Sequence, residues 1–301
     1  MTTLKEREAA QPESSSPRLE RRARQRESWR GFLHAAPAYL YLTLFFTLPL
    51  LIVFVFSFAS RSRTGKPLLE NWNVDSWLRL FDPLVRTIAI RSFWMALFNT
   101  VLCLVIGYPF AYWIATRAKQ STRTLLLVAV LIPFWSNFLV RTYAWRMLLG
   151  VDGYITQLGE ATGLWGRMLF TSPAVFIGLL YGYLPFMVLP LYAALDRMDW
   201  SLVEAGRDLF ASGAKAFWRI TLPLSKPGII AGSILVFIPS LGAYVTPEIL
   251  GGGKVNLLGN YIVTQFGAAR NWPFGSVLSS AVLFVMLVAT IAYFRTGGRT
   301  V

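Results

Sequence analysis

The sequence predicts an all-α membrane protein with six transmembrane helices. Of its 301 residues, 55% are hydrophobic and only 15% are charged, and the mean hydropathy is +0.50. Such an apolar composition is typical of chains that reside in a bilayer. The apolar runs are continuous and not alternating, so each is expected to be a helix, which satisfies its own backbone hydrogen bonds in lipid. The eleven Trp and twelve Tyr residues fit aromatic belts at the two membrane surfaces.

Each apolar run is close to the roughly 20 residues that a helix needs to cross the hydrocarbon core. The expected spans are residues 36–58, 93–116, 125–148, 174–195, 229–250 and 277–294. Each of the first five contains a proline, and kinked helices suit a pathway that opens alternately to the two sides. Prolines are also common in membrane helices in general, so the pattern favours a transporter without excluding a structural role.

Residues 1–31 are rich in charge and cannot bury a core, so we expect a disordered basic cytoplasmic tail. Residues 32–301 are expected to form one membrane domain. The basic cluster of the tail is interpreted as a topology signal and a contact with anionic lipid, with no nucleic acid partner. The single cysteine and the single histidine cannot build a metal cluster, and no metal site is expected.

Lys and Arg residues are about twice as frequent in alternate segments, namely the tail, residues 117–123, residues 197–226 and the C-terminus. This bias predicts that both termini and the loop 197–228 are cytoplasmic. Two segments on the other side, 59–92 and 251–275, are too long for simple turns. They are expected either to dock an external partner or to anchor aromatic side chains at the surface, and YIVTQF within the second fits an amphipathic helix.

The loop 197–228 is a polar stretch between two apolar runs. Ser201, followed three residues later by Glu204, predicts a capping box and the start of a helix. Gly213 lies where this helix is expected to end, and Pro223 interrupts the segment that follows. We therefore expect a short helix, a turn and a second helical segment, which together form a compact knob on the cytoplasmic face.

The same loop resembles the cytoplasmic loop of permease subunits of ABC importers, whose pattern is Glu-Ala-Ala, three residues, Gly, nine residues, Ile-x-Leu-Pro. Gly206 stands where the pattern has Ala, and Phe210 stands where it has its central Gly. Nearby Gly206 and Gly213 are expected to supply flexible backbone for the turn. The residues that the resemblance assigns to ATPase coupling are Ser201, Glu204, Ala205, Gly206, Asp208, Phe210, Gly213, Ile220, Leu222 and Pro223.

Several segments resemble spermidine/putrescine permeases more closely. They are IGYPFAYWIA (106–115), IPFWSNFLVRTYAW (132–145), YGYLPFMVLPLYAAL (181–195), GIIAGSILVFIPSLGAY (228–244) and LLGNYIVTQF with RNWPFG (257–275). One departure bears on the substrate, because Asn271 stands where that family usually has Asp in Arg-Asp-Trp-Pro. Relatives that import other amines, amino-acid derivatives or phosphonates therefore remain alternatives to a polyamine importer.

The resemblance implies the type I ABC importer transmembrane-domain fold in a bacterial inner membrane. It also implies three further subunits and a delivery protein: a second homologous permease, two ATPase subunits and an extracytoplasmic substrate-binding protein. The chain has no phosphate-binding loop, so it is not expected to be an enzyme. It is expected to bind no cofactor itself, with ATP and Mg²⁺ held by the ATPases, and Glu204 is expected to face a base on one of them.

Polar and aromatic residues in the spans are candidates for a solute pathway. In the fifth run, Ser240, Tyr244 and Glu248 recur at helical spacing on one face, together with Ser233 and Phe237. Aromatic faces and a carboxylate suit a cationic solute, although helix-to-helix hydrogen bonds remain an alternative role for each residue. The predicted pathway residues are Tyr108, Tyr112, Trp135, Asn137, Ser240, Tyr244 and Glu248.

A secondary transporter that works without ATP is the alternative from another class. It predicts an internal repeat and an ion or proton relay at the membrane centre, and the sequence shows neither an obvious repeat nor a carboxylate in the middle of a run. A membrane enzyme or scaffold would leave the loop 197–228 unexplained.

Overall fold

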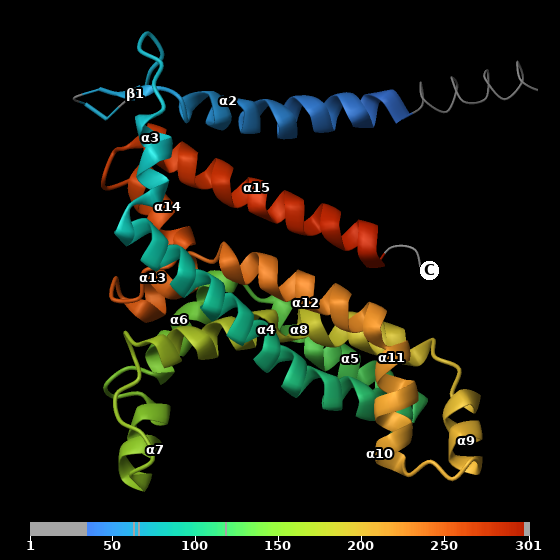
Figure 1. The fold of residues 1–301 in the computed structure, drawn as a ribbon. Helices are drawn as coiled ribbons and strands as arrows, with labels where there is room; N and C mark the ends of the chain where they lie inside the picture. The colour runs from blue at the N-terminus through green and yellow to red at the C-terminus, as the bar shows by residue number, and fades with distance from the viewer. Residues whose placement is uncertain (1–34, 63, 66, 118, 298–301) are drawn as a thin grey trace, which may run out of the picture. The chain divides into compact units, whose positions relative to one another are not determined.

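The computed structural model describes residues 35–62, 64–65, 67–117 and 119–297 (Figure 1). The basic tail expected over residues 1–31 lies outside the described residues. The chain divides into two compact units, Met1–Val55 and Phe56–Val301, and each is described by itself.

The described part of the first unit is one helix, Ala35–Phe56, whose last residue belongs to the second unit. A π-helical turn, η2 (Thr43–Thr47), leads into α2 (Leu48–Phe56). The turn precedes Pro49, which has no N–H to donate to the carbonyl four residues earlier, and a widened turn accommodates that loss. None of the most apolar 18-residue window of this helix is buried. A helix that is apolar all round suits lipid or a helix of another chain.

Three helices form the core of the second unit: α4 (Pro83–Arg117), α8 (Ser172–Asp196) and α12 (Lys226–Leu241). Each packs on the other two (Figure 1). Their shared cluster contains fully buried Cys103, Met187, Leu191 and Val236. We expected the second span to begin near residue 93, but α4 begins ten residues earlier, at Pro83. Residues 83–92 include Arg86 and Arg91, which lower the hydropathy of this stretch, although its backbone is helical.

Two glycines bring α12 against α8. A Cβ at Gly228 would lie 2.8 Å from the carbonyl oxygen of Pro190, and one at Gly232 would lie 3.2 Å from that of Met187. The two glycines are four residues apart, so they lie on one helix face. Small residues at this spacing let helix backbones approach closely in membranes.

The third expected span, 125–148, is not one helix. The helix α5 (Gln120–Trp135) ends at Ser136, and α6 (Phe138–Leu148) leaves it at an angle of 91°. Ser136 and Asn137 have extended backbone, and the Asn137 side chain accepts a hydrogen bond from the backbone N–H of Leu139. The prediction of a continuous helix was wrong because hydropathy measures the length of an apolar run and carries no information about a cap inside it.

The fifth expected span, 229–250, is also interrupted. The helix α12 ends at Leu241, and α13 (Val245–Gly251) begins only after Tyr244. Before α12, three short helical segments bend from it by 64°, and these are α10 (Gly213–Ala216), η4 (Phe217–Thr221) and α11 (Leu222–Leu224). In the described part of the chain, four helices are long and apolar enough to cross a membrane, or six if each bent pair counts as one span.

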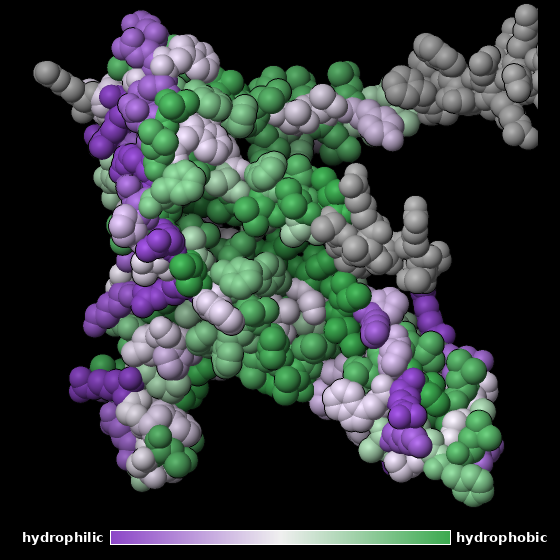
Figure 2. All heavy atoms as spheres, viewed as in Figure 1, coloured by the Kyte–Doolittle hydropathy of each residue, from purple (hydrophilic) through white to green (hydrophobic). Residues whose placement is uncertain are grey.

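The remaining elements lie at the end of the unit opposite α9 and α10 (Figure 1). A small antiparallel hairpin joins β1 (Ser60–Arg61) to β2 (Pro67–Leu68). The helices that follow in chain order are α3 (Asp75–Leu78), η3 (Arg79–Phe81), α7 (Tyr154–Thr162) and α14 (Leu258–Phe266), with α15 (Trp272–Gly297) beginning at this end. The helix expected at YIVTQF is confirmed as part of α14, whereas α7 was not predicted. Figure 2 shows hydrophilic residues gathered at the two ends of the unit, with hydrophobic side chains between them.

Candidate functional site

The helix α9 (Ser201–Asp208) begins where the sequence predicted, but a different residue caps it. Asp199 accepts a hydrogen bond from the backbone N–H of Ser201 at 3.0 Å. Interaction with the Ser201 side chain, and then this backbone hydrogen bond, lower the pKa of the Asp199 carboxyl below its ordinary value. The predicted capping box between Ser201 and Glu204 was wrong. An Asp two residues before the N–H that it binds fills the N-cap role.

The end of α9 is a left-handed turn at Phe210. The backbone N–H of Ala211 donates to the carbonyl of Gly206, and that of Phe210 donates to the carbonyl of Arg207. This is the Schellman pattern, in which the residue at the position of Phe210 has left-handed backbone and is usually glycine. Phe210 has a φ of +59°. A residue with a side chain pays about 1–2 kcal/mol for this conformation.

Two glycines of the loop take roles other than those predicted. Gly213 does not end α9; it opens α10, where the Ser212 side chain accepts from the backbone N–H of Lys215. Gly206 lies inside α9, and its carbonyl accepts the hydrogen bond that closes the turn, so it supplies no flexible backbone there. A Cβ there would lie 2.4 Å from Cδ1 of Ile220, so the missing side chain lets Ile220 pack directly on the helix.

Residues of the loop are tied to α4 by one hydrogen bond and a group of rings. The hydroxyl groups of Tyr108 and Ser225 lie 2.8 Å apart and are buried. The ring of Phe217 packs edge-on against Tyr108 and Tyr112 at 5.6 and 5.9 Å, and Trp200 packs against Tyr112 at 6.0 Å. The structure therefore places Tyr108 and Tyr112 at the junction between α4 and the loop. Their predicted role in lining a solute pathway stays a prediction.

The outer face of the loop is polar and available. Ala205 and Asp208 are exposed, and Pro223 is exposed beside half-buried Leu222. Glu204 is exposed too, and it makes no side-chain hydrogen bond or ion pair with any described residue. Its carboxylate can therefore face a base on another chain. Pro223 follows the π-helical turn η4, which accommodates the N–H that proline cannot donate.

The two helix interruptions meet at a small pocket. The helices α6 and α13, which follow the two breaks, pack on each other. A cavity of about 160 Å³ lies there and is lined by Phe138, Tyr183, Pro239 and residues 242–246. The Tyr183 hydroxyl donates to the carbonyl of Pro239 at 3.2 Å, near the end of α12. Three aromatic side chains and the end of a helix thus surround one cavity.

The predicted pathway residues are only partly brought together. Tyr244 lines this cavity. Asn137 caps α6 and directly precedes Phe138, which also lines the cavity. Ser240 is buried and accepts a hydrogen bond from the Asn99 side chain at 2.9 Å, so it joins α12 to α4. Glu248 is exposed on α13, and Trp135 is 84% exposed at the end of α5. The expected single face through Ser240, Tyr244 and Glu248 was wrong, because the helix stops at Leu241.

Arg141 on α6 is an uncompensated charge. Its guanidinium carbon lies 5.5 Å from the ring centroid of Phe134 and 5.8 Å from that of Phe138. Its Nε and Nη1 are buried and have no hydrogen-bond partner among the described residues. Burying a charge without an acceptor is costly, so an acceptor from outside the described chain would stabilise this site.

Asn271 caps α15. It is buried, and its side-chain oxygen accepts from the backbone N–H of Phe274 at 3.5 Å. Asp and Asn serve this role about equally well. The position at which the sequence departs from the Arg-Asp-Trp-Pro pattern is therefore a helix cap.

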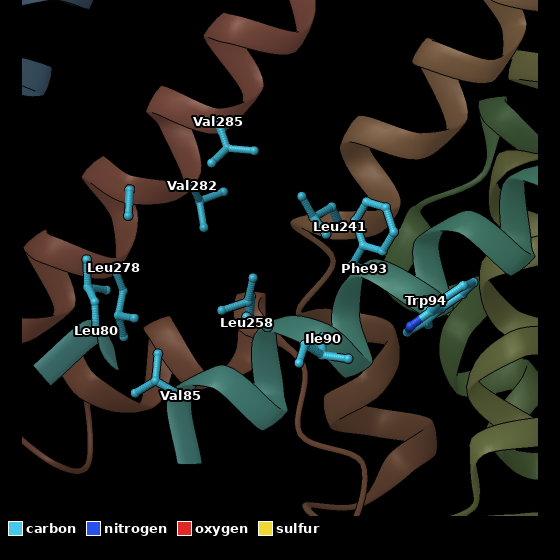
Figure 3. A pocket seen from close by; sticks show the side chains of 12 residues that line it. Leu80, Val85, Ile90, Phe93, Trp94, Leu241, Leu258, Leu278, Val282 and Val285 are labelled. Carbon is cyan, nitrogen blue, oxygen red and sulfur yellow. The ribbon is translucent and has the colours of Figure 1, made fainter. Parts of the chain in front are cut away.

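A second cavity is apolar. Its volume is about 420 Å³, and it lies between α4 and α15, with Ile90, Phe93, Leu278 and Val282 among its lining residues (Figure 3). It presents almost no polar surface to a charged or hydrogen-bonding solute. The cavity at the helix breaks is therefore the better candidate for solute contact.

Three features of the site were missed from the sequence. Tyr183 and Asn99 carry no local pattern that separates them from other polar residues of membrane helices. The Gly228-x-x-x-Gly232 spacing inside an apolar run was a usable signal for close helix packing.

Residues 107–296 match the family described as "Binding-protein-dependent transport system inner membrane component". The chain is 40% identical over 258 residues to the spermidine/putrescine transport system permease protein PotB of Escherichia coli (strain K12), covering 85% of this chain and 93% of that protein. PotB of Haemophilus influenzae is also 40% identical over 85% of this chain, with 90% of its own length covered.

A solved bacterial ABC transporter involved in the import of the acidic polysaccharide alginate has a chain with the same fold. The TM-score is 0.64 at 16% sequence identity, over 93% of this chain and 99% of that chain. The alginate transporter in complex with a pentasaccharide-bound periplasmic protein gives a TM-score of 0.65 at 16% identity, over 90% of this chain and 96% of that chain. The helical fold of an ABC importer permease is thereby confirmed.

Proposed function

Since the chain belongs to the family of binding-protein-dependent transport system inner membrane components, we propose that it is a permease subunit of an ATP-driven importer of polyamines such as spermidine and putrescine. The proposal that the solute is a polyamine rests on the 40% identity to PotB over 85% of the chain. The cap role of Asn271 supports it further, because the residue that departs from the pattern binds the backbone of its own helix, a role that Asp and Asn both serve.

The proposed transporter contains this chain, a second homologous permease, two ATPase subunits and an external binding protein. The chain has no phosphate-binding loop, so ATP and Mg²⁺ are held by the ATPases. Both termini and the loop 197–228 are cytoplasmic in this proposal, and the segments 59–92 and 251–275 face the binding protein. Membrane lipid surrounds the spans.

Coupling in this proposal runs from the loop to the core helices. Glu204 faces a base on an ATPase, and closure of the ATPases on ATP displaces α9. The displacement reaches α4 through Phe217 and through the hydrogen bond between Ser225 and Tyr108. Buried contacts of this kind transmit movement because packed interfaces deform little. The core helices then alternate between inward-open and outward-open arrangements.

A polyamine would pass the cavity at the helix breaks. The aromatic faces of Phe138, Tyr183 and Tyr244 attract ammonium groups. The Pro239 carbonyl near the end of α12 accepts a hydrogen bond from Tyr183, and a carbonyl oxygen has a second lone pair that can accept from an amine. Weak and distributed contacts suit a site that must release its solute.

Uptake of labelled spermidine and putrescine tests the proposal, in cells whose only polyamine importer is the one that contains this chain. We expect uptake with wild type and its loss with Glu204→Ala, while the protein still inserts. Glu160→Ala, which changes an exposed glutamate on α7, is the matched control and should transport normally. Normal uptake in Glu204→Ala would count against the coupling role, and no polyamine uptake by wild type would refute the substrate.

Arg141 favours a second candidate, an importer of amines that also carry a carboxylate. Its unpartnered guanidinium lies against Phe138, which lines the cavity, and a carboxylate would satisfy it. Competition between labelled putrescine and a linear amino acid of similar length separates the candidates. Stronger inhibition by the amino acid in wild type than in Arg141→Gln would support the second one.

A further inference from the structure

The turn between α9 and α10 presents two apolar side chains to solvent. Leu209 is 81% exposed and Phe210 is 98% exposed. We name this pair the apolar tip. The turn between α9 and α10 lies at the end of the knob away from the core helices (Figure 1).

The fold of this chain does not require phenylalanine at the turn. The backbone of Phe210 has a φ of +59°, a conformation in which glycine is free of strain and phenylalanine is not. Its ring makes no aromatic or cation–π contact with any described residue, and its exposure leaves it without packing of its own. The residue therefore carries a conformational cost that nothing in the described chain offsets.

The neighbours of the apolar tip make lipid an unsuitable cover. Arg207 and Asp208 precede it directly, and Lys215 follows in α10, all of them exposed. Inserting the tip into hydrocarbon would carry these charges towards it, which is costly. An apolar centre with a polar rim is instead the composition of a protein interface.

We propose that the apolar tip is the anchor by which this permease binds its ATPase subunit, and that the ATPase carries an apolar recess for the Phe210 ring. The inference rests on the proposed function, which places α9 against the ATPase. Glu204 lies on the same short helix, so a base on the ATPase and the recess would contact the knob together. An ATPase that serves permeases with glycine at this turn needs no such recess, so Phe210 also selects the cognate ATPase.

Binding of the ATPase subunit of the proposed transporter tests the anchor. The protein is the purified permease pair in nanodiscs, and affinity is measured for wild type, Phe210→Gly and Phe210→Ala. We expect both variants to lose affinity on the order of 30-fold, the effect of truncating an interface hot spot. Phe81→Ala is the matched control, because Phe81 is 82% exposed at the opposite end of the unit and should not alter binding.

The melting temperature of the permease pair without ATPase separates the anchor from a structural role. Phe210→Gly should melt at or above the wild-type temperature, because it relieves the left-handed strain. A lower melting temperature would show that the ring serves the permease's own fold, and would overturn the anchor. Wild-type affinity in Phe210→Gly would overturn the anchor alone, whereas a wild-type pair that binds no ATPase would refute the proposed function and the anchor with it.

Discussion

The Tyr108 hydroxyl makes a buried polar link between α4 and the loop 197–228. It lies 2.8 Å from the Ser225 hydroxyl, which also donates to the carbonyl of Leu222. In Tyr108→Phe the serine keeps that second partner, so no buried donor is orphaned. We expect a loss of about 1 kcal/mol in the free energy of unfolding, measured by thermal denaturation in detergent.

The control for this change is Tyr112→Phe. Tyr112 packs against the same Phe217 ring, but its hydroxyl makes no hydrogen bond with a described residue. It should melt like wild type. In the assembled transporter, Tyr108→Phe should also lower the ratio of solute moved to ATP hydrolysed. Equal ratios in Tyr108→Phe and Tyr112→Phe would argue against a role of the Tyr108 hydroxyl in coupling.

Asp199 gives the start of α9 a defined pH dependence. Its pKa is lowered in the folded protein from the ordinary value of 3.8. A group of this kind stabilises the fold fully above its ordinary pKa, and the contribution is lost as the pH falls through the lowered value. Wild type should therefore resist proteolysis at α9 better than Asp199→Ala at neutral pH, and the difference should begin to shrink as the pH falls below 3.8 and be smallest once the pH is below the lowered value. A difference that grows on acidification would contradict this assignment.

Some residue roles in the loop 197–228 could be predicted from local sequence patterns, and others could not. The start of α9 and the positions of Glu204 and Pro223 follow from spacing, but the cap does not. Ser201 and Asp199 are both good capping residues, and only the backbone decides which one reaches an N–H. The left-handed turn at Phe210 could not be predicted either, because phenylalanine rarely adopts this backbone conformation. The sequence instead favoured Gly213 as the end of the helix, whereas α9 ends at Asp208.

At the scale of elements, the close approach of α8 and α12 depends on Gly228. A methyl group there would meet the Pro190 carbonyl oxygen at 2.8 Å and the Ala194 Cβ at 2.6 Å. Gly228→Ala should destabilise the protein by about 1–3 kcal/mol, as overpacking does. Gly213→Ala is the control, because a Cβ at Gly213 meets nothing within 4 Å, and thermal denaturation of both variants checks the expectation. Equal melting temperatures would mean that the two helices can separate at no cost.

Asn137 holds the interruption between α5 and α6. Its side chain accepts from the backbone N–H of Leu139 at 2.8 Å. Asn137→Ala should cost about 1 kcal/mol of stability, whereas Asn137→Asp retains an acceptor and should preserve the fold. Uptake by the Asp variant then reports on a pathway role separately from stability. A full loss of stability in Asn137→Asp would show that the amide group has a further partner.

Element positions were predictable where hydrophobicity alone decides them. The runs that became α4 and α8 are uniformly apolar, and their helices contain the expected residues. The runs that became α5 with α6, and α12 with α13, were expected as single helices. The cap at Asn137 is a hydrogen bond to Leu139, and the segment 242–244 is non-helical backbone; an average of hydropathy over a window contains neither feature.

For the whole molecule, the single cysteine makes membrane topology directly measurable. Cys103 is fully buried, so an impermeant thiol reagent should not label wild type. Lys215→Cys should be labelled only from the cytoplasmic side and Lys254→Cys only from the outside, in vesicles of opposite orientation. Labelling of Lys215→Cys from outside would show the opposite topology, in which the loop 197–228 cannot contact cytoplasmic ATPases.

The fold class of the whole chain was the most predictable property. Six runs of about 20 apolar residues and one polar loop suffice to indicate a helical permease, because bilayer thickness fixes the length of a span. The bends of 91° and 64° were beyond prediction, since the length and hydropathy of an apolar run do not encode the angle at a break.

The loop 197–228 leaves the core from α8 and returns to it in α12, and the glycines 228 and 232 hold these two helices backbone to backbone. Helices packed this closely are expected to move together, so in the proposed transport cycle a displacement of the knob would tilt both of them. With 25 residues, α8 is about 37 Å long. If α8 and α12 rotate about a point near the knob, a small displacement of their cytoplasmic ends produces a larger displacement of their opposite ends.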